Sequence, residues 1–252
     1  MTVCAVACGS DPSAPAATDA RATEPREAGA ADPEATPTST PGADASLDSG
    51  SDGAPSDAGA GPDSALVVAR PYNFRVPSGY DATKPTPLVV ALHGYADWGA
   101  KIDGFGLGTI VDAKGFLYAY PNGSVDLSGN RFWNATDACC NLTFLPVDDV
   151  AYLNAVLDDI EAKYNVDPKR IFVVGHSNGG FMSHRFACDA ASRVAAIASL
   201  GGAQWFDPSR CAPAAKVSVL EVHGDDDQTI HYGGGIAAAL YPSAPTTVAT
   251  WA

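Results

Sequence analysis

Residues 171–186 read IFVVGHSNGGFMSHRF, in which an apolar run ends at a serine enclosed by glycines and a different periodicity follows. The run IFVV is apolar at every position, which is typical of a strand buried on both faces of a parallel sheet. The residues from 178 to 189 fit a helix. Ser177 therefore lies on a tight turn from a strand into a helix, either as a reactive group or as an ordinary polar turn residue.

Apolar runs alternate with segments of helical periodicity throughout residues 66–252. This alternation predicts one α/β domain with a mostly parallel sheet and helices on both faces. In such sheets the chemistry lies at the carboxyl ends of the strands. Besides the strand at 170–175, strands are expected at 65–77, 87–94, 116–121, 194–202 and 216–224, and further helices at 105–114 and 148–164.

The first 65 residues have a different composition. They hold no Phe, Tyr or Trp and carry a net charge of −9 out of the −14 of the whole chain. With so little apolar surface to bury, residues 9–65 are expected to form a disordered acidic linker. Nucleic acid is not expected as a partner, because the chain has no basic stripe that could displace counterions. No apolar window reaches the ~20 residues of a membrane span.

Residues 1–8 resemble the end of a bacterial lipoprotein signal, with Cys8 preceded by small and apolar residues and followed by Gly9. The resemblance implies that Cys8 is lipidated and that the protein is extracellular or attached to the cell envelope. Membrane contact would then run only through the lipid. Two features depart from the pattern, because Ala5 stands where leucine is usual and no basic segment precedes it. The alternative is an incidental cysteine in the linker.

The domain contains four cysteines, Cys139, Cys140, Cys188 and Cys211. An even number in an exported protein suggests disulfides, and four cysteines allow three pairings. Adjacent cysteines rarely bond each other, so Cys139 and Cys140 are each expected to find a partner elsewhere. The spacing fits no zinc site, and neither a metal nor a cofactor is expected.

The surroundings of Ser177 favour a nucleophile. A strand before it and a helix after it are the context in which a serine is lifted above a sheet, and flanking glycines let the neighbouring backbone approach. The helix N-terminus behind it favours developing negative charge. The oxyanion donors are expected to be the backbone N–H groups of Asn178 and of Tyr95 in the loop LHGYADWG at 92–99. His93 is expected to hold this loop.

A carboxylate that supports such a serine should follow a later strand. The stretch LEVHGDDDQTIHY at 220–232 offers Asp225, Asp226 and Asp227 at the end of an expected strand. This pattern alone leaves all three open, and an acidic cluster in a loop can also be a solvated turn.

Six stretches of the chain form a distinctive set: LHGYADWG, YPNGS, FWNATDACC, VDDVAYL, VDPKRIFVVGHSNGGFMSHRFAC and VHGDDDQTIHY. Together they resemble the polyhydroxybutyrate depolymerase and feruloyl esterase family of secreted α/β-hydrolases, over nearly all of residues 66–252. The resemblance implies a serine esterase for ester substrates, either polysaccharide-linked feruloyl or acetyl-xylan esters of plant cell walls or short hydroxyacid polyesters. The family segment His-Gly-x-x-Asp implies that Asp227 is the acid.

The histidine base of a Ser-His-Asp triad is not evident in the chain. The resemblance implies a histidine well beyond the acid, after one more strand, whereas His231 follows Asp227 by only four residues. Because the chain ends at TTVATWA, we expect it to be C-terminally incomplete, nearly inactive by itself, and left with an unpaired sheet edge. His231 as a substitute base stays open. The five histidines are His93, His176, His184, His223 and His231.

Trp133, Trp205 and Trp98 are candidates to flank the substrate, with core or loop packing as the alternative. The protein is expected to be a monomer. Two other functions stay open: a serine peptidase on the same fold, and a non-catalytic surface lipoprotein that has lost its base.

Overall fold

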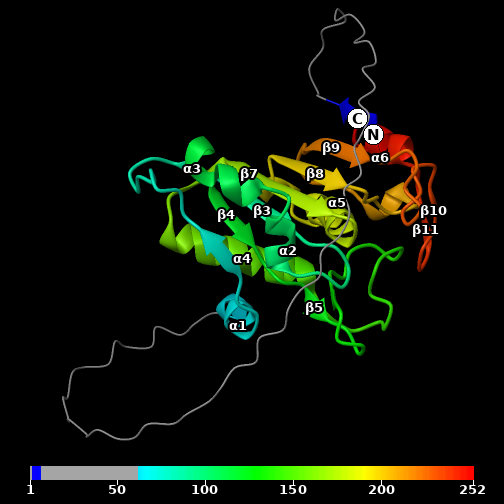
Figure 1. The fold of residues 1–252 in the computed structure, drawn as a ribbon, viewed down its shortest axis with the longest axis horizontal. Helices are drawn as coiled ribbons and strands as arrows, with labels where there is room; N and C mark the ends of the chain where they lie inside the picture. Colours follow the sequence, from blue (N-terminus) through cyan, green and yellow to red (C-terminus); the bar gives the residue numbers. More distant parts are fainter. Residues whose placement is uncertain (1, 7–61) are drawn as a thin grey trace, which may run out of the picture. The chain divides into compact units, whose positions relative to one another are not determined.

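Five parallel strands form the centre of one sheet in the computed structural model, which describes residues 2–6 and 62–252 (Figure 1). The order across the sheet is β1-β9-β8-β7-β3-β4-β2, so β7, the strand that leads to Ser177, lies in the middle. The outermost strands β1 and β2 run antiparallel to their neighbours β9 and β4. The strands are β1 (Thr2–Val6), β2 (Asn73–Arg75), β3 (Thr86–Leu92), β4 (Leu117–Tyr120), β7 (Val166–His176), β8 (Ala196–Leu200) and β9 (Ser218–His223).

Helices and two short hairpins connect these strands. Asp148 caps the helix that follows it, since its side chain accepts a hydrogen bond from the N–H of Ala151. The helices are α1 (Pro62–Ala69), α2 (Gly99–Asp103), α3 (Val111–Lys114), α4 (Asp149–Lys163), α5 (Asn178–Asp189) and α6 (Ala244–Trp251). The hairpins are β5 (Ser124–Val125) with β6 (Arg131–Phe132) and β10 (Gly235–Ile236) with β11 (Leu240–Tyr241), and short 3₁₀ turns span Leu107–Ile110, Ala191–Arg193 and Pro208–Arg210.

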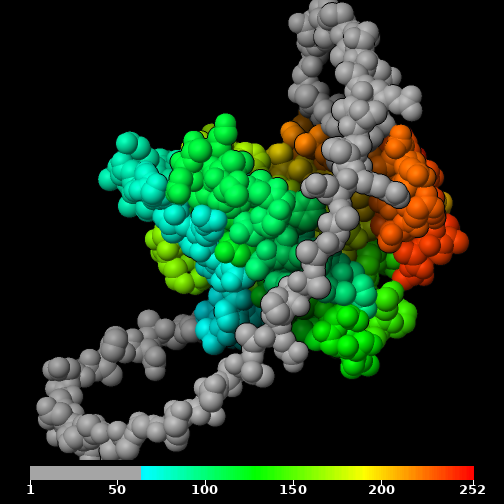
Figure 2. Space-filling view, viewed as in Figure 1, coloured from blue at the N-terminus to red at the C-terminus, as the bar shows by residue number. Residues whose placement is uncertain are grey.

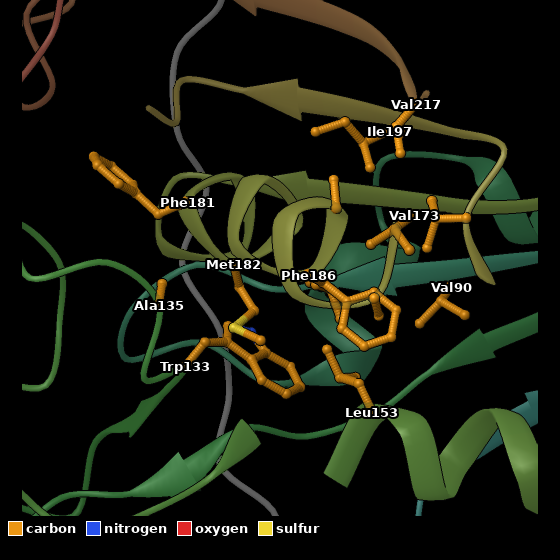
Figure 3. Packing of buried hydrophobic residues seen from close by; sticks show 14 of the residues in the cluster. Val90, Trp133, Ala135, Leu153, Val173, Phe181, Met182, Phe186, Ile197 and Val217 are labelled. Carbon is orange, nitrogen blue, oxygen red and sulfur yellow. The ribbon is translucent and has the colours of Figure 1, made fainter. Parts of the chain in front are cut away.

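The sheet has a hydrophobic layer on each face. On one face, α4 and α5 bury apolar side chains against alternate residues of the parallel strands, and Figure 3 shows Trp133 with Leu153, Met182 and Phe186 in this layer. On the other face, Ile102 of α2 and Val111 of α3 form a smaller cluster with side chains of β3 and β4. Because a strand points successive side chains to opposite faces, both layers draw on the same strands. The predicted α/β-hydrolase architecture is confirmed.

The expected strand at 65–77 is wrong in its first half. Residues 62–69 form α1, and only residues 73–75 form a strand, β2, which pairs with β4. Leu66 and Val67 of α1 pack against the main core. The run ALVVA is too short for periodicity to separate a strand from a helix, so tertiary packing decides.

Two disulfides, Cys188–Cys211 and Cys139–Cys140, lie within the described residues. The first joins α5 to the segment before β9, with its Cα atoms 5.3 Å apart. The expectation that Cys139 and Cys140 bond other partners is wrong, because these neighbours bond each other. The peptide bond between them is cis, and their Cα atoms are 3.1 Å apart.

The sheet edge next to β9 is occupied by β1, whose Thr2 and Val6 pair with His223 and Val219. The expected unpaired edge is therefore not seen among the described residues. Cys8 and most of the predicted linker lie outside the described residues. Within the described part, no helix is both long and apolar enough to cross a bilayer, and no cluster of three His, Cys, Asp or Glu side chains could hold a metal ion.

Candidate active site

Ser177 lies between β7 and α5 in a backbone conformation that L-residues rarely adopt. Its φ is 51° and its ψ is −117°, and its N–H donates to the carbonyl of Leu200 at the end of β8. Non-glycine residues hold such a conformation only where the surrounding structure enforces it, and these positions concentrate at functional sites. The Ser177 side chain makes no hydrogen bond as the cap of α5. Its hydroxyl is therefore not committed to capping this helix.

Gly175 and Gly179 allow this turn because backbone occupies the space of their missing side chains. A β-carbon on Gly175 would overlap the carbonyl of Gly179, and one on Gly179 would overlap the carbonyl of Leu92. β7, α5 and the end of β3 can therefore approach one another closely only with glycine at both positions. Close backbone packing therefore explains why both positions of the motif hold glycine.

The loop after β3 lies beside the serine. A β-carbon on Gly94 would lie 3.6 Å from Cβ of Ser177. The neighbouring carbonyl of Gly94 is held in place, because His93 Nδ1 lies 2.7 Å from it and the N–H of Asp97 donates to it at 3.2 Å. In a trans peptide the C=O and N–H groups point in opposite directions, so the N–H of Tyr95 points away from these partners. This N–H donates no hydrogen bond within the described residues, which suits an oxyanion donor.

His93 is fully buried and holds this loop through both ring nitrogens. Nε2 accepts a hydrogen bond from the N–H of Gly123 at 2.9 Å, so Nδ1 carries the proton that it donates to Gly94. Burial lowers the pKa of His93, which favours this neutral form. A ring with both nitrogens engaged has none left to abstract a proton from Ser177.

The hairpin β5–β6 packs on the same loop. The Tyr95 hydroxyl donates to Asp126 at 2.7 Å, and the N–H of Ala96 donates to the carbonyl of Arg131 at 2.8 Å. The hydrogen bond to Asp126 raises the pKa of Tyr95 and lowers the pKa of Asp126. The side chain of Tyr95 is thus a structural anchor, while its backbone N–H stays free.

Asn178 contributes a second free backbone N–H as the first residue of α5, where no helical acceptor exists for it. This is the position from which the residue after a nucleophilic serine donates to an oxyanion. Its side chain, by contrast, is fully buried and bonds Trp133. Ser177, the Tyr95 loop and the Asn178 N–H are therefore brought together at the carboxyl end of β3 and β7.

Asp227 lies in the turn after β9 with one carboxylate oxygen held by two backbone donors and the other without a hydrogen bond from the described residues. Oδ1 accepts from the N–H groups of Thr229 at 2.8 Å and Ile230 at 3.0 Å. Oδ2 lies 3.8 Å from Nε2 of His223, and a β-carbon on Gly201, after β8, would lie 3.5 Å from it. Oδ2 accepts no hydrogen bond from the described residues, so it is available to a further donor.

The other two aspartates of this turn are placed differently. Asp226 accepts a hydrogen bond from the side chain of Gln228 at 2.7 Å, and Asp225 makes no hydrogen bond or ion pair within the described residues. Both are exposed or nearly so. Of the three, Asp227 has the carboxylate that backbone donors hold in one orientation.

No histidine hydrogen-bonds Ser177 within the described residues. His184 and His223 both face Glu221, and each uses its second ring nitrogen for Trp251 or for the carbonyl of Ile230. The His176 ring lies against Phe105, with ring centroids 5.1 Å apart. His231 is exposed, and its Nδ1 lies 3.1 Å from the backbone carbonyl of Asp227. His176 Nδ1 is near the serine, since a β-carbon on Gly94 would lie 3.2 Å from this nitrogen and 3.6 Å from Cβ of Ser177, but it makes no hydrogen bond within the described residues.

A buried polar network supports the turn that carries Asp227. Glu221 lies 3.1 Å from His184 and 3.3 Å from His223, and all three side chains are buried. Burial alone would raise the pKa of Glu221, but hydrogen bonds from both histidines outweigh it and lower this pKa. Burial alone would lower the pKa of His223, but Glu221 and the Ile230 carbonyl raise it above its ordinary value. The pH interval over which both Glu221 and His223 are charged is therefore wider than for the free side chains.

We expect His223 to stabilise the fold most at mildly acidic pH. Its raised pKa contributes stability that is complete below the ordinary pKa of about 6.5 and is lost as pH rises through the folded-state pKa. The free energy of unfolding, measured with urea from pH 5 to 9, should therefore fall toward the value of His223→Gln as pH increases. Glu221→Gln should reduce the change of the free energy of unfolding with pH. A constant difference between wild type and His223→Gln across this range would contradict the prediction.

Two of the three tryptophans expected to contact substrate are buried. Trp133 has no exposed surface and Trp205 is 5% exposed, with the guanidinium of Arg210 over its ring at 5.7 Å. Trp133 therefore packs in the core, and its indole ring is not accessible to a substrate. Trp98 is half exposed at the start of α2. Substrate contact by Trp205 or Trp98 stays a prediction.

Sequence reasoning missed Asp149, which ties the segment before β2 to the loop before α4. Asp149 is fully buried, pairs with Arg70 at 2.7 Å and accepts from the N–H of Asn134 at 2.6 Å. Its neighbour Asp148 has the visible signal of a helix cap, whereas nothing in the local pattern distinguishes Asp149 from a solvated first-turn carboxylate. A buried ion pair between distant segments cannot be read from spacing alone.

Loops from two distant parts of the chain meet near the carboxyl ends of the strands. In Figure 2 the surface of the loop before α4 (green) adjoins that of the C-terminal segment (orange to red). The N–H of Ala238 donates to the carbonyl of Ala138 at this junction, at 2.9 Å. Such loops form the binding surface in open α/β sheets.

Residues 121–228 match the family model described as the alpha/beta hydrolase fold. The crystal structure of esterase PE8 superposes with a TM-score of 0.51 at 23% identity, covering 64% of this chain and 78% of that one, which shows a shared fold. The chain therefore has the α/β-hydrolase fold.

Its curated relatives are esterases. Feruloyl esterase C of Emericella nidulans is 30% identical over 175 residues, which are 69% of this chain and 60% of the relative. Feruloyl esterase B of Piromyces equi is 29% identical over 171 residues (66% and 31%), and the putative esterase NocK of Nocardia uniformis subsp. tsuyamanensis is 29% identical over 174 residues (67% and 49%). The chain thus spans from about a third to three fifths of these relatives. The resemblance to an esterase family is confirmed, whereas its polyhydroxybutyrate part stays a prediction.

Proposed function

We propose that this protein hydrolyses carboxylic esters through an acyl-Ser177 intermediate. Oγ of Ser177 attacks the ester carbonyl, its proton passes to a base, and the N–H groups of Tyr95 and Asn178 bind the oxyanion. The protonated base then donates this proton to the alcohol as the alcohol leaves, and water hydrolyses the acyl-enzyme by the same route. The observation that carries this proposal is the strained backbone of Ser177. Near it, the backbone N–H groups of Tyr95 and Asn178 donate no hydrogen bond within the described residues.

Asp227 is the proposed orienting acid. Its free Oδ2, held by a carboxylate whose other oxygen is fixed, favours it over Asp225 and Asp226 as the acceptor for an imidazole N–H. None of the five histidines hydrogen-bonds Ser177 within the described residues, so none of them is proposed as the base. We therefore propose that residues 1–252 hydrolyse esters slowly, at the residual rate that the oxyanion donors and substrate binding provide.

Esters on plant polysaccharides are the proposed substrates. The names of the relatives, feruloyl esterases and a bifunctional acetylxylan esterase/xylanase, favour feruloyl and acetyl groups over hydroxyacid polyesters. The Cys188–Cys211 disulfide supports an oxidising, extracellular location. Attachment to the cell envelope through a lipid on Cys8 is part of the same proposal.

Imidazole in solution should replace the missing base and accelerate hydrolysis by residues 1–252. A positioned general base contributes about 10²- to 10⁴-fold, so a diffusing one is expected to recover at least about tenfold. The rate is measured with methyl ferulate, acetylated xylan and hydroxybutyrate oligomers, with and without imidazole. We expect the first two to be hydrolysed faster than the third.

Three sets of variants make this test specific. Ser177→Ala should abolish the imidazole-dependent rate, and Asp227→Asn should lower it at least about tenfold. Asp225→Asn and Asp226→Asn, in the same turn, should stay within about twofold of wild type. An imidazole effect that is equal in Ser177→Ala and wild type would overturn the proposed nucleophile, and equal losses in all three aspartate variants would overturn the choice of Asp227.

A further inference from the structure

The side chain of Asn178 forms a two-point clamp on the backbone of Trp133. Its Oδ1 accepts from the Trp133 N–H at 2.7 Å, and its Nδ2 donates to the Trp133 carbonyl at 3.0 Å. Both side chains are fully buried, so no water competes with these bonds. The residue after the nucleophile is thus bound to a segment 45 positions away in the sequence.

Trp133 continues this connection to the loop after β3. Its indole N–H donates to the carbonyl of His93 at 3.0 Å, and the two rings lie 5.2 Å apart. His93 in turn fixes the carbonyl of Gly94, and with it the direction of the Tyr95 N–H. One continuous path of hydrogen bonds therefore joins the two proposed oxyanion donors.

Packing alone does not account for this path. A core tryptophan needs burial and one partner for its N–H, and Trp133 also stacks on Tyr152 with centroids 6.5 Å apart. The clamp by Asn178 adds nothing to that burial, since it engages only backbone groups. A buried amide with both its ends satisfied fixes geometry, because any shift of either segment breaks two hydrogen bonds.

We propose that Asn178, acting through Trp133 and His93, sets the separation and direction of the two oxyanion N–H donors. Asn178 then has two roles: its backbone N–H touches the reacting oxygen, and its side chain is a positioning group. Trp133 is a positioning residue and does not contact the substrate. This inference rests on the proposed function and names the residues that tune its oxyanion site.

Trp133→Phe removes the indole N–H while keeping an aromatic ring in the core. The Ser177-dependent kcat with methyl ferulate and imidazole is expected to fall about 10- to 100-fold, with KM within about threefold, because donors that shift mainly affect the transition state. Asn178→Ala should likewise lower kcat about 10- to 100-fold and leave KM within about threefold. Asn141→Ala is the matched control, since Asn141 clamps both backbone groups of Leu145 in a loop that contacts neither donor. This control should keep kcat within about twofold.

Amide hydrogen exchange tests the same inference without catalysis. The N–H groups of Ala96 and Gly123 are protected by bonds to the Arg131 carbonyl and to His93. Both should exchange about tenfold faster in Trp133→Phe and stay unchanged in Asn141→Ala. Unchanged exchange together with unchanged kcat in Trp133→Phe would overturn the positioning role. If wild type shows no Ser177-dependent rate, the proposed function fails, and the exchange result still decides whether Trp133 holds the loop.

Discussion

Gly179→Ala is expected to destabilise the domain by at least about 3 kcal/mol and to remove the Ser177-dependent rate. The new β-carbon would overlap the carbonyl of Leu92 and crowd that of His93, and both belong to backbone that cannot rotate away. Relief would require α5 to move off the end of β3. That movement would separate the Asn178 N–H from the Tyr95 loop, so stability and catalysis should fall together. Urea unfolding and the imidazole-dependent rate measure the two effects.

Gly79→Ala is the control for a glycine replacement without a steric conflict. A β-carbon on Gly79 would meet no atom within 4 Å, and Gly79 is exposed in a turn before β3. The stability of this variant should change by less than about 1 kcal/mol, since alanine mainly reduces the entropy of the unfolded chain there. A Gly179→Ala protein as stable as Gly79→Ala would mean that α5 and β3 are not in close contact in solution.

The parts of the fold that a sequence can predict are those that local patterns enforce. Continuous apolar runs predicted the parallel strands β3, β4, β7, β8 and β9, because both faces of a central strand are buried. The elbow at Ser177 was predictable for the same kind of reason, since strand, glycines and helix are contiguous in the chain. The match of pattern and structure is closest where a few adjacent residues determine the geometry.

The parts that could not be predicted depend on contacts between distant segments. The clamp of Asn178 on Trp133 and the pairing of Arg70 with Asp149 span 45 and 79 positions, and no periodicity encodes them. The Cys139–Cys140 disulfide was not expected, because adjacent cysteines rarely bond each other. Glu221 lies within an apolar strand, where only the structure reveals two histidines as its partners.

The choice of the orienting acid depends on the sequence, on the resemblance to a family and on the structure. The sequence alone left Asp225, Asp226 and Asp227 open, and the resemblance to a family favoured Asp227. The structure adds a physical distinction, because two backbone N–H groups hold only the carboxylate of Asp227. The role of this residue stays a prediction until the aspartate variants are compared.

Ser177→Gly is expected to raise the stability of the domain while removing the Ser177-dependent rate. A residue held in a sparsely populated region of φ and ψ costs about 1–3 kcal/mol, and glycine adopts the conformation of Ser177 without that cost. Glycine also adds about 0.5–1 kcal/mol of unfolded-chain entropy that folding must overcome. The relief of backbone strain is larger than this entropy cost, so the free energy of unfolding in urea is expected to rise by about 1 kcal/mol.

Ser177→Ala separates the backbone contribution from that of the hydroxyl. Alanine keeps the β-carbon, and therefore the strain, and loses only an oxygen that caps no helix. Its stability should lie within about 0.5 kcal/mol of wild type, although both variants lose the rate by several powers of ten. If Ser177→Gly is no more stable than Ser177→Ala, the elbow is not strained in solution. If it is more stable, the domain gives up stability at one residue in order to present the serine hydroxyl to the substrate, which a structural turn has no reason to do.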